Sequence, residues 1–273
     1  MKKVLLLLLC VPLIGFGQTR YLDEIFTDVS VTETDFAQNI SILPMLFGQP
    51  PALTPIECDI YEPIGDNLTN RPVIILCHGG SFLPPVINGQ PTGSVKDSAI
   101  VEQCTRWAKK GYVAVAMGNR KGWNPTSTDQ NVRTSTFVQA LYRGIQDAKA
   151  MVRFMRMTEA SLGNPYGIDP NKIVLGGHGT GGYIALGYAT LDDNNELYLP
   201  KFIDFTDPAN PFPYIYPPYY GNIDGTDLTY FPANTPPFNA PAPFVFNQPN
   251  NPSYSNDINM AFNLGGALAD ISW

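Results

Sequence analysis

The 273-residue sequence has little charge and very little histidine. Charged residues make up 15% of it, against about a quarter in ordinary globular proteins, and its two histidines are His78 and His178. After Lys201 there is no Lys, Arg, His or Glu, whereas six Asp residues follow. The net charge is −7, and no basic segment is present to neutralise phosphates, which argues against nucleic acid as a partner. Two histidines also leave few candidates for a general base.

Sequence motifs for cofactors are absent as well. The sequence contains no phosphate-binding P-loop, no Cys/His spacing typical of zinc sites and no dinucleotide-binding fingerprint, so we expect no cofactor and no metal. Asp192, Asp193 and Glu196 could bind a cation, or they could form a solvated loop after a helix. The segment 224–227 has too few ligands for a calcium loop.

Residues 1–17 have the pattern of a secretory signal peptide. Two lysines precede an apolar run at 4–16, and small residues stand before the expected cleavage point. The run is shorter than the roughly 20 apolar residues of a membrane span, so we expect a secreted or periplasmic chain with no membrane span. Export permits disulfides. Cys58, Cys77 and Cys104 would remain after cleavage of the signal peptide, and because three is an odd number their pairing stays open. Cys77 and Cys104 lie in apolar patterns, which favours buried free thiols.

Strands and helices alternate over residues 55–190. Short apolar runs indicate strands covered on both faces, and the segments between them have helical periodicity. Two earlier strands without a helix between them indicate an antiparallel start. We therefore expect a three-layer α/β sandwich with a mostly parallel sheet. The expected strands are 25–32, 56–61, 73–77, 112–117, 173–175 and 258–264, and the expected helices are 100–110, 134–157 and 180–190.

Between 192 and 256 this alternation stops. Thirteen of the 26 prolines lie between Pro200 and Pro252, among many Tyr, Phe and Asn residues. A loop of this length in a compact domain is usually a lid, a binding surface or disordered, and the aromatic content argues against full disorder. We expect one domain over 18–273 that carries 192–256 as an insertion. The insertion could be a lid, a dimer surface or an aromatic platform for a sugar or polymer.

Two glycine-rich turns follow predicted strands. The first, His78-Gly79-Gly80-Ser81-Phe82, could direct backbone N–H groups at a developing oxyanion. The second, at 176–182, reads Gly-Gly-His-Gly-Thr-Gly-Gly and has the frame of the nucleophile elbow G-x-S-x-G. Either turn alone is a weak signal. Two such turns about 100 residues apart, each after a predicted strand, are together a strong signal.

With these turns the sequence resembles the α/β-hydrolase fold family, in its secreted carboxylesterase and lipase-like branch with an HGG oxyanion turn. The resemblance covers residues 55–190 well and 258–273 weakly. It implies carboxylic-ester hydrolase ancestry and an ester as the substrate. It also implies that the backbone N–H groups of Gly79 or Gly80 and of Thr180 are the oxyanion donors.

The sequence departs from this family at the nucleophile. Gly179 occupies the position of the family's serine, and Thr180, one residue later, is a weak substitute because its side chain should point into the helix packing. The family's acid and histidine follow the nucleophile, but this chain has no histidine beyond His178. We expect His78 to organise the oxyanion turn by hydrogen bonding and His178 to be a packed residue of the elbow. No complete catalytic triad is expected.

Three functional hypotheses follow. The first is a secreted protein of esterase ancestry that is inactive as written. The second is a non-catalytic protein that binds a ligand or partner through the aromatic region 205–256, the ligand being an ester, a glycan or another small molecule. The third is a hydrolase with a relocated site that uses a cation or Thr180. A strand at 258–264 would be followed by two more in the resembled fold, so we also expect a chain that is truncated at Trp273. Its oligomeric state stays open.

Overall fold

The computed structural model describes residues 19–235, 238 and 240–268, so the expected signal peptide and the last five residues lie outside it. Its main sheet has six strands in the order β1-β2-β4-β3-β5-β10. Strands β1, β2 and β4 pair antiparallel, and β4, β3, β5 and β10 pair parallel. This confirms the expected mostly parallel sheet with an antiparallel start. The strands are β1 (Val29–Ser41), β2 (Ala52–Pro63), β3 (Arg71–Cys77), β4 (Val113–Met117), β5 (Ile168–His178) and β10 (Met260–Leu264).

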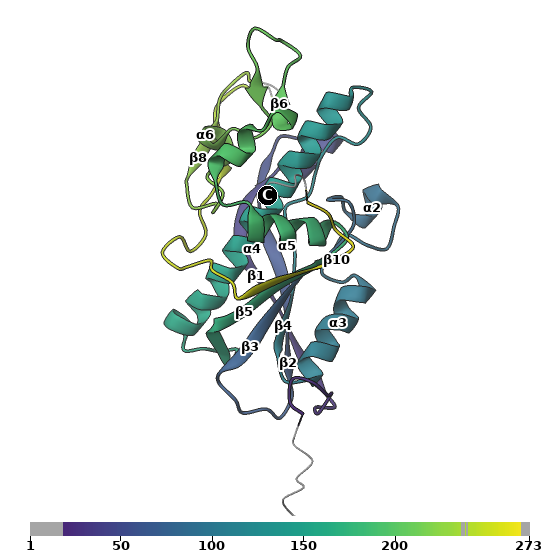
Figure 1. The fold of residues 1–273 in the computed structure, drawn as a ribbon, viewed down its shortest axis with the longest axis vertical. Coiled ribbons are helices and arrows are strands. Elements are labelled where there is room, and N and C mark those ends of the chain that lie inside the picture. Colours follow the sequence, from purple (N-terminus) through teal and green to yellow (C-terminus); the bar gives the residue numbers. More distant parts are fainter. Residues whose placement is uncertain (1–18, 236–237, 239, 269–273) are drawn as a thin grey trace, which may run out of the picture.

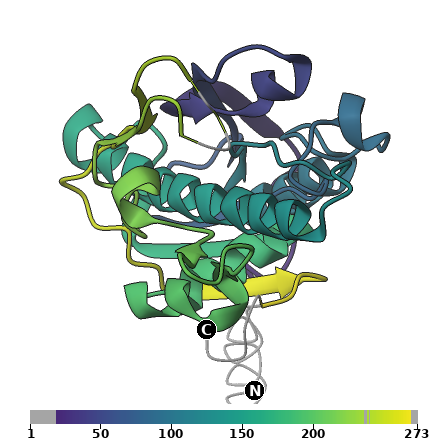
Figure 2. The same ribbon diagram turned by 90° about the horizontal axis from the view of Figure 1, so that it is seen from above.

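Helices cover both faces of this sheet. Helix α3 (Ser98–Lys109) packs on one face, and α4 (Gln130–Leu162) and α5 (Thr180–Thr190) pack on the other (Figure 1). Side chains of β3 alternate between the two cores, with Ile75 on the α4 side and Leu76 on the α3 side. Burial on both faces explains why the central strands are continuous apolar runs. Seen from above, β1 and β10 lie at the two ends of the sheet (Figure 2).

Helix α4 is longer than its apolar stripe predicts. It spans 33 residues, and its first turn is capped by Asp129, whose carboxylate accepts a hydrogen bond from the Asn131 N–H at 2.8 Å. Its buried residues include polar ones, from Gln139 to Arg153. Something other than the sheet must therefore cover a second face of this helix.

The insertion (residues 192–256) provides that cover. It consists of short elements: the 3-10 helices η3 (Asn194–Tyr198) and η4 (Pro200–Phe202), the helix α6 (Pro217–Tyr220) and the strand pairs β6 (Ile203–Asp204) with β7 (Phe212–Pro213) and β8 (Thr229–Phe231) with β9 (Phe244–Asn247). Figure 1 shows β6, α6 and β8 grouped beyond one end of the sheet, beside α4.

Five residues at helical spacing on α4, here called the polar stripe, hold the insertion. Tyr142 Oη donates to the Gly221 carbonyl at 2.8 Å, and Gln146 Nε2 donates to two further insertion carbonyls at 2.9 Å each. Buried polar groups must be hydrogen-bonded, and here the partners are mostly backbone carbonyls of a segment with little regular structure. The polar stripe consists of Gln139, Tyr142, Gln146, Lys149 and Arg153.

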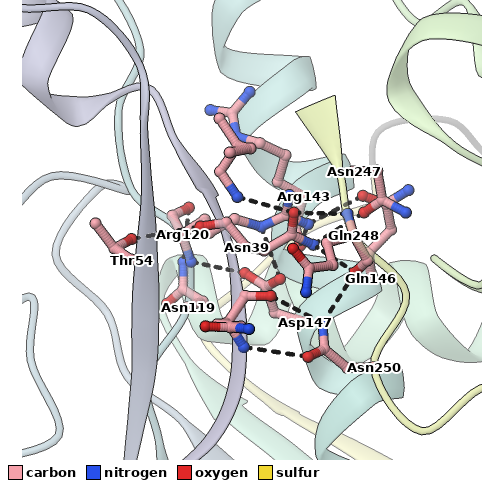
Figure 3. Close-up of polar contacts among 12 residues, drawn as sticks. Asn39, Thr54, Asn119, Arg120, Arg143, Gln146, Asp147, Asn247, Gln248 and Asn250 are labelled. Atoms are coloured by element: carbon pink, nitrogen blue, oxygen red, sulfur yellow. Dashed lines mark hydrogen bonds and ion pairs between the residues drawn. The ribbon is translucent and has the colours of Figure 1, made fainter. Parts of the chain in front are cut away.

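The far end of the insertion is fixed to the edge strand β1. Asn39 Nδ2 donates to Asn247 Oδ1 at 3.0 Å, and Asn39 Oδ1 accepts from the Gln248 N–H at 3.0 Å (Figure 3). Asn250 pairs with the backbone of Gln38 through both its amide oxygen and its amide nitrogen, at 3.1 Å each. The insertion is therefore attached to the sheet edge as well as to α4.

The three cysteines within the described part are all buried and free. Cys77 and Cys104 confirm the expectation of buried thiols, and burial raises the pKa of both. Cys58 is buried and free as well. Among residues 19–235, 238 and 240–268, no helix is both long and apolar enough to cross a membrane.

Candidate functional site

The turn between β5 and α5 has the shape of a nucleophile elbow. Gly179 stands between the strand and the helix with φ +56° and ψ −119°, a left-handed conformation that is costly for any residue with a side chain. Its N–H donates to the Leu264 carbonyl of β10 at 2.9 Å, and its carbonyl accepts from the Gly182 N–H at 2.9 Å. The backbone at Gly179 thus forms a tight, hydrogen-bonded connection between strand and helix, the geometry that a nucleophile elbow requires.

The glycines of this turn differ in what they leave room for. A Cβ atom at Gly177 would lie 2.0 Å from the Gly181 carbonyl oxygen, and one at Gly181 would lie 2.1 Å from the Cys77 carbonyl oxygen. At Gly179 the nearest heavy atom to a Cβ would be the Gly79 Cα, at 3.9 Å. Sterics therefore require glycine at 177 and 181, whereas position 179 has space for a side chain that the sequence does not supply.

The oxyanion turn lies directly beside the elbow. A Cβ at Gly79 would lie 3.2 Å from the His178 carbonyl oxygen, so the two glycine-rich turns are in contact. Gly80 has φ +98° and Ser81 has φ +55°. Trp123 Nε1 donates to the Ser81 carbonyl at 2.7 Å and holds this strained backbone in place. The structure thus brings together the turns that carry the predicted oxyanion donors, Gly79 or Gly80 on one side and Thr180 on the other.

His78 is buried beneath the oxyanion turn. It is 2% exposed, and its Nδ1 lies 2.6 Å from the Gly79 carbonyl oxygen. Burial, and secondarily the charge of Lys121, lowers the pKa of His78 to about 3. Its Nε2 has no hydrogen-bond partner in the part of the chain that the structure describes. The imidazole is therefore neutral at physiological pH and contacts the turn as a structural group.

The other two predicted residues lie in different surroundings. His178 is exposed, so the expectation of a packed elbow residue is wrong. His178 is the last residue of β5, and its exposed imidazole lies beside the Gly79 turn: a Cβ at Gly79 would be 3.6 Å from His178 Nδ1. Thr180 Oγ1 is buried and has no hydrogen-bond partner among the described residues. No base therefore contacts the Thr180 hydroxyl to activate it.

An ion pair that sequence reasoning missed joins the segment after β4 to helix α4. Arg120, just after β4, donates through Nε to Asp147 Oδ1 at 2.8 Å, and its backbone N–H donates to Asp147 Oδ2 at 2.7 Å (Figure 3). Arg143 Nη2 donates to the Gly122 carbonyl at 2.6 Å. Burial raises the pKa of Asp147 and lowers that of Arg143 to about 10. The available signal was an acidic residue, Asp147, at a buried position of the long helix, together with a basic residue just after a strand.

The acidic residues after α5 act as helix caps. Asp193 accepts a hydrogen bond from the Asn195 N–H at 2.8 Å, and the Glu196 carboxylate accepts from the N–H groups that precede the 3-10 helix η3. This reciprocal arrangement is a capping box. Within the described residues, no group of three or more His, Cys, Asp or Glu side chains could hold a metal ion.

A cavity of about 460 Å³, here called the aromatic cavity, lies between α4 and the insertion. Its walls combine rings from the insertion with amide and hydroxyl side chains from the first turns of α4. The lining residues are Asn131, Val132, Ser135, Thr136, Gln139, Asp204, Phe212, Pro213, Tyr214, Tyr219, Tyr220, Phe231 and Thr235.

Comparison with known proteins gives one family match and several similar solved structures. The family model described as BD-FAE matches residues 58–210, which is more than half of the chain. Among solved structures, the native thermophilic esterase Est2 of the planctomycete Thermogutta terrifontis is 27% identical over 49% of this chain and 39% of its own, with a TM-score of 0.34.

The apo form of Thermogutta terrifontis esterase 2 is 25% identical over 51% of this chain and 43% of its own, with a TM-score of 0.37. The form phosphorylated by paraoxon is 22% identical over 57% of this chain and 48% of its own, with a TM-score of 0.38. This chain thus spans less than half the length of these esterases. No curated protein matches it.

Proposed function

Because the chain belongs to the BD-FAE family and is an esterase-like α/β-hydrolase, we propose that it descends from a carboxylic-ester hydrolase and does not hydrolyse esters as written. One observation carries this proposal: Gly179 occupies the elbow conformation, with φ +56°, and has no side chain. Ester hydrolysis through an acyl-enzyme needs a nucleophile at this point. Oxyanion donors stabilise the negative charge of a tetrahedral intermediate, and without a nucleophile this intermediate does not form.

The neighbouring side chains do not replace the missing nucleophile. Thr180 Oγ1 is buried, and no histidine or carboxylate within the described residues hydrogen-bonds to it. His78 is buried with a pKa of about 3, which makes it a very weak base. Loss of the nucleophile in a serine hydrolase costs about 10⁶-fold in kcat, and what remains comes from the oxyanion donors and substrate binding.

The test is a labelling and turnover experiment on the purified chain. It is incubated with a fluorophosphonate probe and, separately, with p-nitrophenyl acetate; adducts are read by intact-mass spectrometry. We expect no covalent adduct, and the same slow p-nitrophenol release from the wild type and from Thr180→Ala. That substitution keeps the backbone N–H and removes only the hydroxyl. An adduct, or turnover that is lost in Thr180→Ala, would overturn the proposal.

Export to the periplasm or the extracellular space is part of this proposal. It is supported by the basic start, the apolar run and the small residues before Gln18. Expression of the full chain in an exporting host should yield a protein that begins at or near Gln18. A chain that keeps its first 17 residues and stays in the cytosol would contradict export.

A second function, ligand binding by the insertion, is favoured by the aromatic cavity. One wall of this cavity is a segment that makes hydrogen bonds along the polar stripe, so the cavity is formed without a ligand. Hydrogen exchange of residues 205–235 with a panel of esters, glycans and peptides tests this function. We expect one class of ligand to protect this segment, whereas protection by none of them would contradict it.

A further inference from the structure

The aromatic cavity is separate from the elbow. On α4, Phe137 faces the elbow side, where its ring centroid lies 5.3 Å from that of Phe82 and 6.1 Å from that of Tyr183. Asn131, Ser135 and Gln139 lie on another face of the same helix and line the cavity. A ligand in the cavity would therefore not contact Gly179.

The rings of the cavity are held in position by one another and by backbone contacts. Tyr219 packs against Phe231 with centroids 5.1 Å apart, and Tyr220 packs edge-to-face on Phe231 at 6.3 Å. Thr229 Oγ1 donates to the Tyr219 carbonyl at 2.7 Å, and Gln139 Nε2 donates to the Tyr214 carbonyl at 2.8 Å. Phe231 and Tyr220 are 2% and 4% exposed and serve as the support of the cavity wall. Phe212 is 48% exposed and Tyr219 is half-buried, so these two rings are accessible to a ligand and are already ordered.

The charge of the cavity is of one sign. No Lys, Arg or His is among its lining residues, and Asp204 contributes a carboxylate. That carboxylate makes no ion pair within the described residues; the backbone N–H of Thr206 donates to it at 2.8 Å. Arg133, the basic residue of the first turns of α4, is directed elsewhere, to the Ser127 carbonyl and to Gln130. Hydrogen bonds from Thr206 and Asn131 lower the pKa of Asp204, so it stays ionised at neutral pH.

We propose that the aromatic cavity binds an organic cation of the alkylammonium class, with its charge against the accessible rings of Phe212 and Tyr219 and beside the Asp204 carboxylate. The faces of aromatic rings attract cations, and cages of aromatic side chains recognise quaternary ammonium groups. An anionic ligand would meet an unpaired carboxylate without a compensating cation. This inference deepens the second proposed function, ligand binding by the insertion, and is independent of whether esters are hydrolysed.

Choline and its uncharged isostere 3,3-dimethylbutan-1-ol are the probes, because they have the same shape and differ in charge. Titration calorimetry on the full chain should show choline binding about tenfold more tightly than the isostere. Asp204→Asn should weaken choline binding about tenfold and leave the isostere unchanged. Tyr219→Leu should weaken choline about fivefold, and Tyr219→Phe, which keeps the ring, should bind as the wild type does.

The matched control is Asp207→Asn, which removes an exposed carboxylate close in sequence that does not line the cavity. It should bind choline as the wild type does. Near-UV circular dichroism of each variant confirms that the insertion is folded. Equal affinity for choline and the isostere, or an Asp204→Asn variant that binds choline normally, would overturn the cationic ligand.

The two levels of the proposal fail separately. If choline and the isostere both fail while a glycan or ester protects 205–235 in hydrogen exchange, the cationic class is wrong and ligand binding by the insertion stands. If no ligand of the panel protects the segment and choline also fails, both proposals are overturned.

Discussion

The elbow and the insertion differ in how their sequence pattern relates to the structure that forms. In the elbow, sterics require glycine at 177 and 181, and Gly179 has space for a side chain but carries none. The insertion has no sequence periodicity and little regular structure, yet it is attached at many points and encloses a cavity. The backbone geometry of a segment therefore tells how it packs, whereas its chemistry depends on which side chains it carries.

The sharpest way to test this contrast is within the elbow itself. Gly181→Ala places a Cβ 2.1 Å from a backbone carbonyl, so we expect it to lower the free energy of unfolding by about 3 kcal/mol or more. Gly179→Ala meets only the left-handed φ and should cost about 1–2 kcal/mol. Urea denaturation of both variants measures the difference. Equal losses would mean that position 179 is as crowded as position 181.

A pH titration of stability tests the oxyanion turn. The pKa of His78 is about 3 in the folded chain and about 6.5 in an unfolded one, so between these values only the unfolded state binds the proton. Stability from this site is thus complete above about pH 6.5 and falls toward pH 3, by up to about 1.4 kcal/mol per pH unit. His78→Gln should flatten that slope. An unchanged slope in the variant would show that His78 is not the group responsible.

At the insertion, Tyr142→Phe removes one hydroxyl from the polar stripe. The Gly221 carbonyl, which accepts from Tyr142 Oη at 2.8 Å, then has no partner from this side chain. We expect a loss of about 1–2 kcal/mol of stability and faster hydrogen exchange in residues 219–226 than elsewhere. Tyr183→Phe, on the next helix, serves as the matched control. If both variants exchange alike, the polar stripe does not hold the insertion.

The smallest effect is expected at the Lys149–Asp224 pair. Its nitrogen and oxygen lie 2.8 Å apart, and the Asp224 side chain is 50% exposed. Burial opposes ionisation of Asp224, but the hydrogen bond and charge of Lys149, together with the hydrogen bond from Asn256 and the charge of Arg153, outweigh it and lower the pKa of Asp224. The pair therefore contributes above about pH 4 and is lost at lower pH, and Asp224→Asn should cost only about 0.5–1 kcal/mol at pH 7. Chemical denaturation at pH 7 and pH 3 measures this, and a larger loss at pH 3 would contradict the sign.

The sheet and its helices were predictable because buried strands and helices produce a periodic pattern of apolar residues in the sequence. The run 73–77 became β3, the strand at 258–264 became β10 beside β5, and the helix expected at 180–190 has those bounds. The start of α4 was expected at 134, but the helix begins at Gln130, because an Asp cap and the insertion extend it. Helix propensity alone does not predict that a distant segment of the chain will pack on this helix.

The site was predictable where it depended on backbone and less so where it depended on tertiary surroundings. Glycine spacing placed the two turns, which the fold then brings into contact. The exposure of His178 and the pairing of Arg120 with Asp147 depend on which elements pack together in the fold. No local sequence pattern gives that information. For Asp193 and Glu196 the sequence left a cation site or a solvated loop open, and the structure shows that they form a capping box of η3.

The polar stripe of α4 has a consequence for how this chain could have changed over time. A helix whose second buried face carries Gln139, Gln146 and Arg153 cannot lose its cover without leaving those groups without partners. The insertion is therefore not a removable module that could be gained or lost in one event. Changes in α4 and in the insertion therefore have to occur together. The identity of residue 179, in contrast, can change alone.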